Sequence, residues 1–119
     1  VLGSGREIRD FVHASDVASA MIFVMDKEIK DPLNISNGKP IRIEEIVKLI
    51  CKNFNNSDYV FTNKGDTGDN KRVMNTNAIR SYGWEPKISL KDGIEDTIKW
   101  YVKKGYKGYK RYNSFKEEL

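Results

Sequence analysis

The stretch GSGREIRDFVHASDVA, residues 3–18, decides the fold of this chain. Its central part, Ile8 to His13, predicts a short strand. Ser15 or Asp16 can then cap a helix, because a short side-chain oxygen satisfies the free N–H groups of the first turn. We expect this helix to run to about Lys27. A strand that leads directly into a helix indicates an α/β fold.

Working outward, further helices and short strands are expected along the chain. The first helix should bury a face made of Val17, Ala20, Met21, Val24 and Met25, and Asp31-Pro32 should break it. The middle of the chain predicts a strand at Leu33–Ser36 with a turn at Asn37-Gly38, followed by a helix that buries Ile43, Ile46, Val47, Ile50 and Phe54. A second strand is expected at Tyr59–Thr62, and a polar loop over residues 63–70. An extended stretch at Arg72–Met74 should then lead into a short helix over Asn75–Tyr82 that ends at Gly83. The last helix should be capped by Ser89 with Asp92 at capping-box spacing, bury Leu90, Ile94, Ile98, Tyr101 and Val102, and stop at Gly105 and Gly108.

Composition indicates one ordinary globular domain. Of 119 residues, 39% are hydrophobic and 32% are charged, and no apolar run approaches the roughly 18 residues that a membrane span needs. No secretion signal opens the chain, so we expect a cytoplasmic protein. The lone Cys51 cannot form an internal disulfide and is predicted to be a small buried or half-buried helix residue. With a single histidine besides, the sequence offers no credible zinc site.

No catalytic constellation is visible in the sequence. His13, Ser15 and Asp16 supply the residue types of a hydrolytic triad, but such close neighbours at a strand end rarely converge. The Gly3–Gly5 turn is not a dinucleotide fingerprint, because that motif follows a strand and precedes a helix, and here a strand follows. We therefore interpret it as a turn that leads into the first strand.

Two basic elements could bind an anionic ligand. Arg9 lies within the first predicted strand, where an arginine must be paired or face a cleft. The second element is the polar loop and the residues after it, with Lys64, Asp66, Asp69, Lys71 and Arg72. Cations on separate elements could clamp a diphosphate, arginine with a forked grip. Ordinary surface ion pairing is the alternative.

Four motifs, in order from residue 3 to about 102, resemble the extended short-chain dehydrogenases/reductases. Residues 3–18 are similar to that family's G-x-G-x-x-x-R-D-F-(I/V)-H-V-x-D-V-A, and residues 34–38 resemble its N-(I/V)-G-x-G. Gly68-Asp69, residues 75–78 and residues 82–86 resemble G-D, D-x-S-K and L-G-W-x-P, and residues 89–100 fit the closing S-L-x-x-G-(I/L)-x-x-T-(I/V)-x-W helix. The family includes nucleotide-sugar epimerases, dehydratases and reductases.

The resemblance implies that this chain is the small C-terminal domain of such an enzyme, with short strands, packed helices and the Rossmann half absent. Residues 1–102 would be the substrate-binding domain, and residues 103–119 a basic, tyrosine-rich tail. A nucleotide-diphosphate sugar would contact Arg9, Asp69 and a nearby cation (Lys64, Lys71 or Arg72), while His13 and Asp16 would be architectural, Asp16 as a helix cap. NAD or NADP and the catalytic residues would belong to the missing half, which also allows a homodimer in the full-length enzyme. No metal is implied.

Some residues depart from the family pattern and keep other functions open. Asp66 stands where epimerases often carry arginine, and Asn75 and Ala78 replace an aspartate and a lysine. These departures leave the sugar unnamed and keep open a family member without catalysis. A basic module that binds nucleic acid or an acidic protein is the rival class, because the chain carries a net charge of +4 and tyrosines interleave with lysines near its end. The solvated tail is favoured over nucleic-acid binding.

Overall fold

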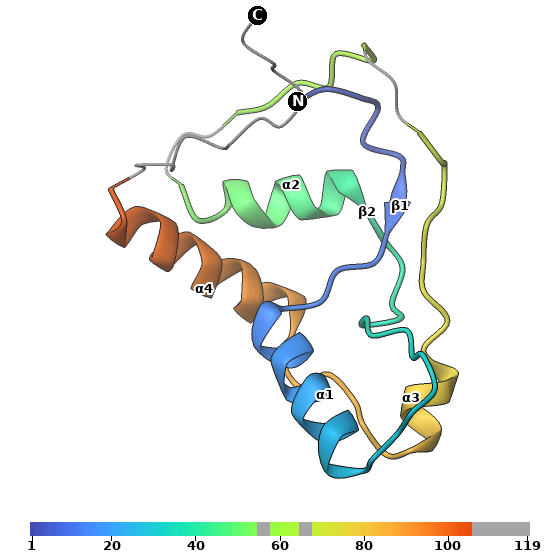
Figure 1. The fold of residues 1–119 in the computed structure, drawn as a ribbon. Coiled ribbons are helices and arrows are strands. Elements are labelled where there is room, and N and C mark those ends of the chain that lie inside the picture. Colours follow the sequence, from blue (N-terminus) through green and yellow to red (C-terminus); the bar gives the residue numbers. More distant parts are fainter. Residues whose placement is uncertain (55–57, 65–67, 106–119) are drawn as a thin grey trace, which may run out of the picture.

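The computed structural model describes residues 1–54, 58–64 and 68–105. Within these ranges the elements follow the order β1 (Ile8–Arg9), α1 (Ala14–Asp26), β2 (Ile41–Arg42), α2 (Ile43–Cys51), α3 (Asn77–Ser81) and α4 (Leu90–Lys103). The strands form an antiparallel ribbon in which Ile8 faces Arg42 and Arg9 faces Ile41. Helices α2 and α4 pack side by side near this ribbon, and α1 and α3 lie at the opposite end of the molecule (Figure 1). The expected α/β class is confirmed.

Local end signals place α3 and α4 as the sequence predicts. The Ser89 hydroxyl accepts the Asp92 N–H at 3.1 Å and caps α4, while Gly105, with φ of 65°, follows its last turn. Gly83, with φ of 98°, follows the end of α3. Glycine tolerates this left-handed conformation without a Cβ clash, so it ends both helices cleanly.

Helix α1 ends as predicted but is capped by a different residue. His13, and neither Ser15 nor Asp16, occupies the cap position, where its ring Nδ1 accepts the Ser15 N–H at 3.3 Å. The helix ends at Asp26 with Lys27 as its C-cap, which confirms the expected end near Lys27, and the chain then turns through Glu28 at a φ of 52°. Asp16 does not cap the helix because its carboxylate accepts hydrogen bonds from residues 87 and 88 instead.

Fewer of the predicted residues form strands than the sequence analysis expected. Only Ile8–Arg9 of the first predicted strand is regular, and β2 at Ile41–Arg42 was not predicted. Neither Leu33–Ser36 nor Tyr59–Thr62 forms a strand, although Val1 donates to the Val60 carbonyl at 2.8 Å and accepts the Thr62 N–H at 3.1 Å. A strand requires a partner along its length, and within the described ranges these segments have little or none.

The core joins α1, α3 and the loop after α3. Ala20, Ile79 and Trp84 are buried, and Phe23, Val24, Leu33 and Ile35 pack against them. Ala20 and Val24 thus confirm part of the predicted α1 face. Val17 is half-buried. Other parts of the predicted faces were wrong, because six of their residues are exposed: Met21, Met25, Ile50, Phe54, Tyr101 and Val102. Phe54 also lies beyond the end of α2.

Cys51 is half-buried at the end of α2, as predicted. No helix within the described ranges is long and apolar enough to cross a membrane. Most of the predicted basic tail, from residue 106 and including Gly108, lies outside the described residues.

Candidate functional site

The predicted ligand-binding loop runs beside β1. Ile8 donates its N–H to the Asn70 carbonyl and accepts the Arg72 N–H, each at 2.9 Å, so that Ile8 and Lys71 form an isolated parallel bridge. This pairing places residues 69–72 next to the strand that carries Arg9. The extended stretch predicted after the loop is therefore paired to β1 at its start.

Two arginines meet on Asp69. The Arg9 guanidinium donates through Nη1 to the Asp69 carbonyl and to the Ile8 carbonyl, each at 2.8 Å. The Arg72 guanidinium donates through Nη2 to the Asp69 carboxylate at 2.9 Å. Arg9, Asp69, Lys71 and Arg72, called the Arg9 cluster below, thus lie on adjacent stretches of chain: both guanidiniums bond to Asp69, and Lys71 is placed here by its main-chain bridge to Ile8.

The Arg9 cluster lies on an open surface. The side chains of Arg72 and Asp69 are 69% and 65% exposed, so their ion pair stabilises the fold by no more than about 1 kcal/mol. Such a pair can rearrange at little cost. An anionic group that arrives at this surface could therefore recruit the Arg72 guanidinium, while the bonds of Arg9 to two main-chain carbonyls keep that side chain beside the loop.

Lys64, the remaining predicted ligand residue, lies elsewhere. Its carbonyl accepts the Gly3 N–H at 3.1 Å, which ties this residue to the beginning of the chain. No hydrogen bond or ion pair within the described ranges joins Lys64 to the Arg9 cluster.

Asp10, a residue that the sequence reasoning passed over, holds the surroundings of the cluster. Its carboxylate accepts the Gly38 N–H at 3.1 and 3.0 Å and the Met74 N–H at 3.3 Å. It therefore fastens the turn after residue 36 and the chain beyond Arg72 to the end of β1. The sequence did contain a signal for this role. Neighbours on a strand point to opposite faces, so an Asp10 that follows Arg9 had to find partners other than Arg9.

The glycine turn before β1 packs against the chain itself and does not fit a dinucleotide. Gly5 has a φ of 75°, and a Cβ there would lie 2.5 Å from the Phe61 ring. The space that a pyrophosphate would need next to the glycine backbone is thus filled. Ser4 donates to the Glu7 carboxylate at 2.8 Å, and this hydrogen bond is the main cause that lowers the pKa of Glu7 below its ordinary value.

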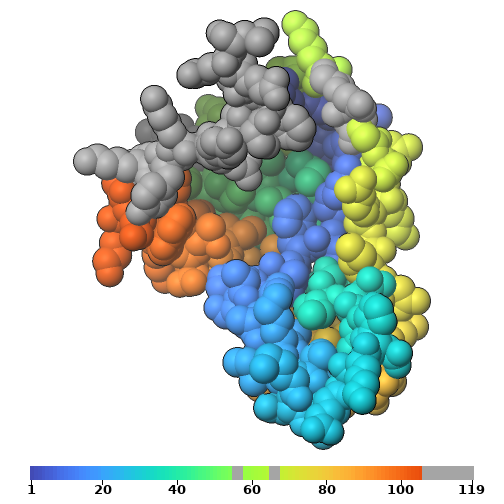
Figure 2. Space-filling model, viewed as in Figure 1, coloured from blue at the N-terminus to red at the C-terminus, as the bar shows by residue number. Residues whose placement is uncertain are grey.

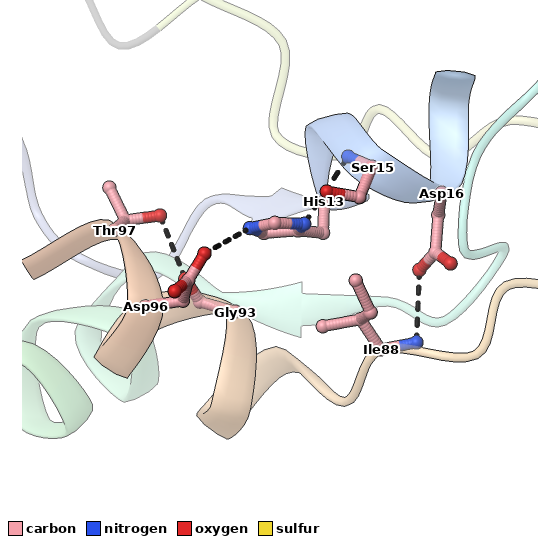
Figure 3. A network of polar contacts seen from close by, with 7 residues as sticks. All are labelled: His13, Ser15, Asp16, Ile88, Gly93, Asp96 and Thr97. Atoms are coloured by element: carbon pink, nitrogen blue, oxygen red, sulfur yellow. Dashed lines mark hydrogen bonds and ion pairs between the residues drawn. The ribbon is translucent and has the colours of Figure 1, made fainter. Parts of the chain in front are cut away.

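His13, Ser15 and Asp16 do not form a triad (Figure 3). His13 accepts the Ser15 N–H through Nδ1, and its Nε2 lies 3.5 Å from the Asp96 carboxylate of α4. The buried Asp16 carboxylate points away from His13 and accepts the N–H groups of Lys87 and Ile88, each at 3.0 Å. His13 thus caps α1, to which Ser15 contributes its main-chain N–H, and Asp16 ties α1 to the chain before α4 instead of capping its own helix.

An apolar cavity of about 220 Å³ lies apart from the Arg9 cluster. It is lined by residues 11–13, by Ile50 of α2 and by Ile94 and Ile98 of α4. Gly93 brings α4 close to His13, since a Cβ there would lie 3.2 Å from the ring. No group of three or more metal-binding side chains occurs in the part of the chain that the structure describes.

Comparison with known proteins supports the resemblance found in the motifs. Residues 1–97 match the family model described as GDP-mannose 4,6 dehydratase. GDP-L-fucose synthase 1 of Arabidopsis thaliana is 33% identical over 87% of this chain and 32% of its own length. Human dTDP-D-glucose 4,6-dehydratase is also 33% identical, over 83% of this chain and 31% of its own length.

A solved structure supports the same resemblance. GDP-mannoheptose C4 reductase from Campylobacter jejuni, with NADP bound, superposes with a TM-score of 0.67 at 32% identity, covering 86% of this chain and 34% of that one. The chain therefore spans about a third of the length of the proteins it matches.

Proposed function

Because this chain belongs to the GDP-mannose 4,6-dehydratase family of extended short-chain dehydrogenases/reductases, we propose that it is the nucleotide-sugar-binding part of an NAD(P)-dependent epimerase, dehydratase or reductase. Residues 1–102 would form the binding domain and residues 103–119 a tail. The single observation that carries the proposal is the meeting of Arg9 and Arg72 on Asp69 beside β1.

In this proposal the Arg9 cluster binds the diphosphate of the substrate. A guanidinium offers parallel N–H donors that match phosphate oxygens, and two of them from different segments can grip a diphosphate from two sides. Lys71 adds a third positive charge next to Arg72. Asp69 would act through its main-chain carbonyl and its carboxylate, which hold the two arginines on one side of the loop. Lys64, whose carbonyl is bonded to Gly3, remains a predicted ligand residue from the sequence alone.

Cofactor and chemistry would come from the part of the protein that the relatives carry beyond the matched third. NAD or NADP would supply hydride transfer there, and the described residues offer it no cradle, since the Phe61 ring fills the space beside Gly5. The open position of the Arg9 cluster fits this division, because a second surface would have to close over a bound nucleotide sugar. A homodimer of the full-length enzyme and a cytoplasmic location remain predictions from the sequence.

The first test replaces Arg9 with alanine in the full-length enzyme and measures affinity for GDP-mannose, UDP-glucose and dTDP-glucose by calorimetry. Whichever of these probes the unmodified enzyme binds should lose about 1.5–3 kcal/mol of binding free energy, because a charge-assisted contact to phosphate is removed. That loss corresponds to roughly a tenfold to hundredfold increase in Kd.

Arg6→Ala is the matched control, because Arg6 is an exposed arginine three positions earlier in the same stretch. It should leave the Kd unchanged. If Arg9→Ala also leaves the affinity intact in a folded enzyme, Arg9 serves only to hold Asp69, and the proposed diphosphate site is wrong.

A second test concerns the isolated chain. The 119-residue chain mixed with NADH or NADPH and each of the three nucleotide sugars should produce no change in cofactor absorbance, because it lacks a cofactor cradle. A reproducible change that is absent in buffer controls would contradict the assignment of the chemistry to the missing part.

A further inference from the structure

Another pocket lies where the chain before β2 meets the chain ahead of α4. Residues 37 and 39–41 line it together with residues 86–90 and Phe11. Its volume of about 380 Å³ falls within the range of roughly 300–1,000 Å³ that is typical of small-molecule sites. Figure 2 shows the chain between α1 and β2, in cyan to turquoise, at the surface of the molecule. None of the residues proposed to bind the diphosphate lines this pocket.

The lining of the pocket combines two cations with apolar surface. Lys39 and Lys87 contribute one positive charge from each segment, and no aspartate or glutamate lines the pocket. Within the described ranges neither lysine forms an ion pair with a carboxylate. Phe11, Pro40 and Pro86 supply apolar ring surface beside these charges. Such a lining favours an anionic ligand that also has a carbon-rich face.

The carboxylates that bond to the chain ahead of α4 are occupied by other partners. Asp16 accepts the main-chain N–H groups of Lys87 and Ile88, each at 3.0 Å. Asp92 accepts the Ser89 hydroxyl at 2.6 Å. In the described part of the chain, the positive charge at the pocket is therefore not neutralised by direct contact with either carboxylate.

Asn37 brings an acceptor without a donor to the same pocket. Its side-chain oxygen Oδ1 is buried and has no hydrogen-bond partner among the described residues. The main chain around it is held from two directions, because Arg80 donates to the Asn37 carbonyl at 2.9 Å and the Gly38 N–H donates to the Asp10 carboxylate at 3.0 Å. Buried polar atoms almost always have a partner, so an orphan held rigidly beside a pocket indicates that a ligand supplies the donor.

We propose that this pocket is a second ligand site, separate from the Arg9 cluster, and that it binds a monosaccharide phosphate. Lys39 and Lys87 hold the phosphate between the two segments, and the Asn37 Oδ1 accepts a hydroxyl of the sugar ring. The apolar lining packs against the ring carbons. The chemistry that defines the ligand is a phosphate next to a small hydroxyl-bearing ring, and the inference does not depend on the proposed function.

Calorimetric titration of the full-length enzyme with glucose 6-phosphate tests the proposal. Lys39→Gln and Lys87→Gln should each raise the Kd about tenfold, because each removes a charge-assisted contact to the phosphate. Asn37→Ala should raise the Kd for glucose 6-phosphate but not the Kd for inorganic phosphate, which has no sugar ring to reach that oxygen. The fold should survive Asn37→Ala, because the buried Oδ1 has no bond to lose in the unliganded chain.

Lys99→Gln is the matched control, because Lys99 is an exposed lysine of α4 that does not line the pocket. It should leave the Kd for both probes unchanged. The absence of binding at millimolar glucose 6-phosphate would overturn the proposal, and so would equal binding by the unmodified enzyme and both lysine variants. Binding that Arg9→Ala abolishes, or that a nucleotide sugar displaces, would also overturn it, because the ligand would then occupy the Arg9 cluster. An enzyme that binds glucose 6-phosphate as expected but no nucleotide sugar would sink the proposed function alone.

Discussion

Asp16 joins two segments that are far apart in the chain, and its replacement should cost much of the stability. Asp16 is 3% exposed, and its carboxylate accepts two main-chain N–H groups, from Lys87 and Ile88, which lie 71 and 72 positions further on. Asp16→Ala removes both bonds at once. The N–H groups of Lys87 and Ile88 would then lack their acceptor at a buried position.

The expected loss follows from these two bonds. Hydrogen bonds to a charged acceptor contribute about 1.5–3 kcal/mol each, and bonds that share one acceptor are less than additive. We therefore expect Asp16→Ala to lower the free energy of unfolding by about 3 kcal/mol. Asp16→Asn keeps one carbonyl oxygen as an acceptor and should lose about half as much.

Urea unfolding of the 119-residue chain, followed by circular dichroism, measures both variants. Asp26→Ala is the control, because Asp26 is an exposed aspartate at the other end of the same helix, and its replacement should change stability by no more than about 0.5 kcal/mol. A loss below about 1 kcal/mol for Asp16→Ala, at an unchanged denaturant slope, would refute the role assigned to this carboxylate.

Two further predictions concern the turn before β1. Gly5→Ala should destabilise the chain by about 2 kcal/mol or more in the same urea assay, because the new Cβ would lie 2.5 Å from the Phe61 ring at a φ of 75°. Gly83→Ala, with open space around it, should cost only the backbone strain of about 1 kcal/mol. The pKa of Glu7 is lowered in the folded chain, so the unfolded chain takes up the proton first as the pH falls. The ionised Glu7 therefore contributes fully to the free energy of unfolding above the ordinary pKa of 4.5. This contribution is lost as the pH falls through the folded-state pKa. Ser4→Ala should make this acid-induced loss of stability smaller. If the variant and the unmodified chain show the same pH dependence of stability, the Ser4 hydrogen bond is not the cause of the lowered Glu7 pKa.

The sequence by itself determined those features that depend on contacts within a turn or two. Ser89 and Asp92 are three residues apart, so their capping bond could be predicted from spacing, as could the glycine that follows α4. The four motifs in register also sufficed to indicate the family. The resemblance implied that Arg9 and the loop around Asp69 contact one ligand, and the structure places the two next to each other.

Only the tertiary structure decided which partner each polar group and each strand obtains. Asp16 has the chemistry of a helix cap, yet it accepts N–H groups from the chain before α4, and His13 takes the cap position instead. Leu33–Ser36 has the pattern of a strand but is not one within the described ranges. A strand exists only when a second strand bonds to it, and an acceptor chooses among all donors that the fold brings near, so neither outcome is contained in the local sequence.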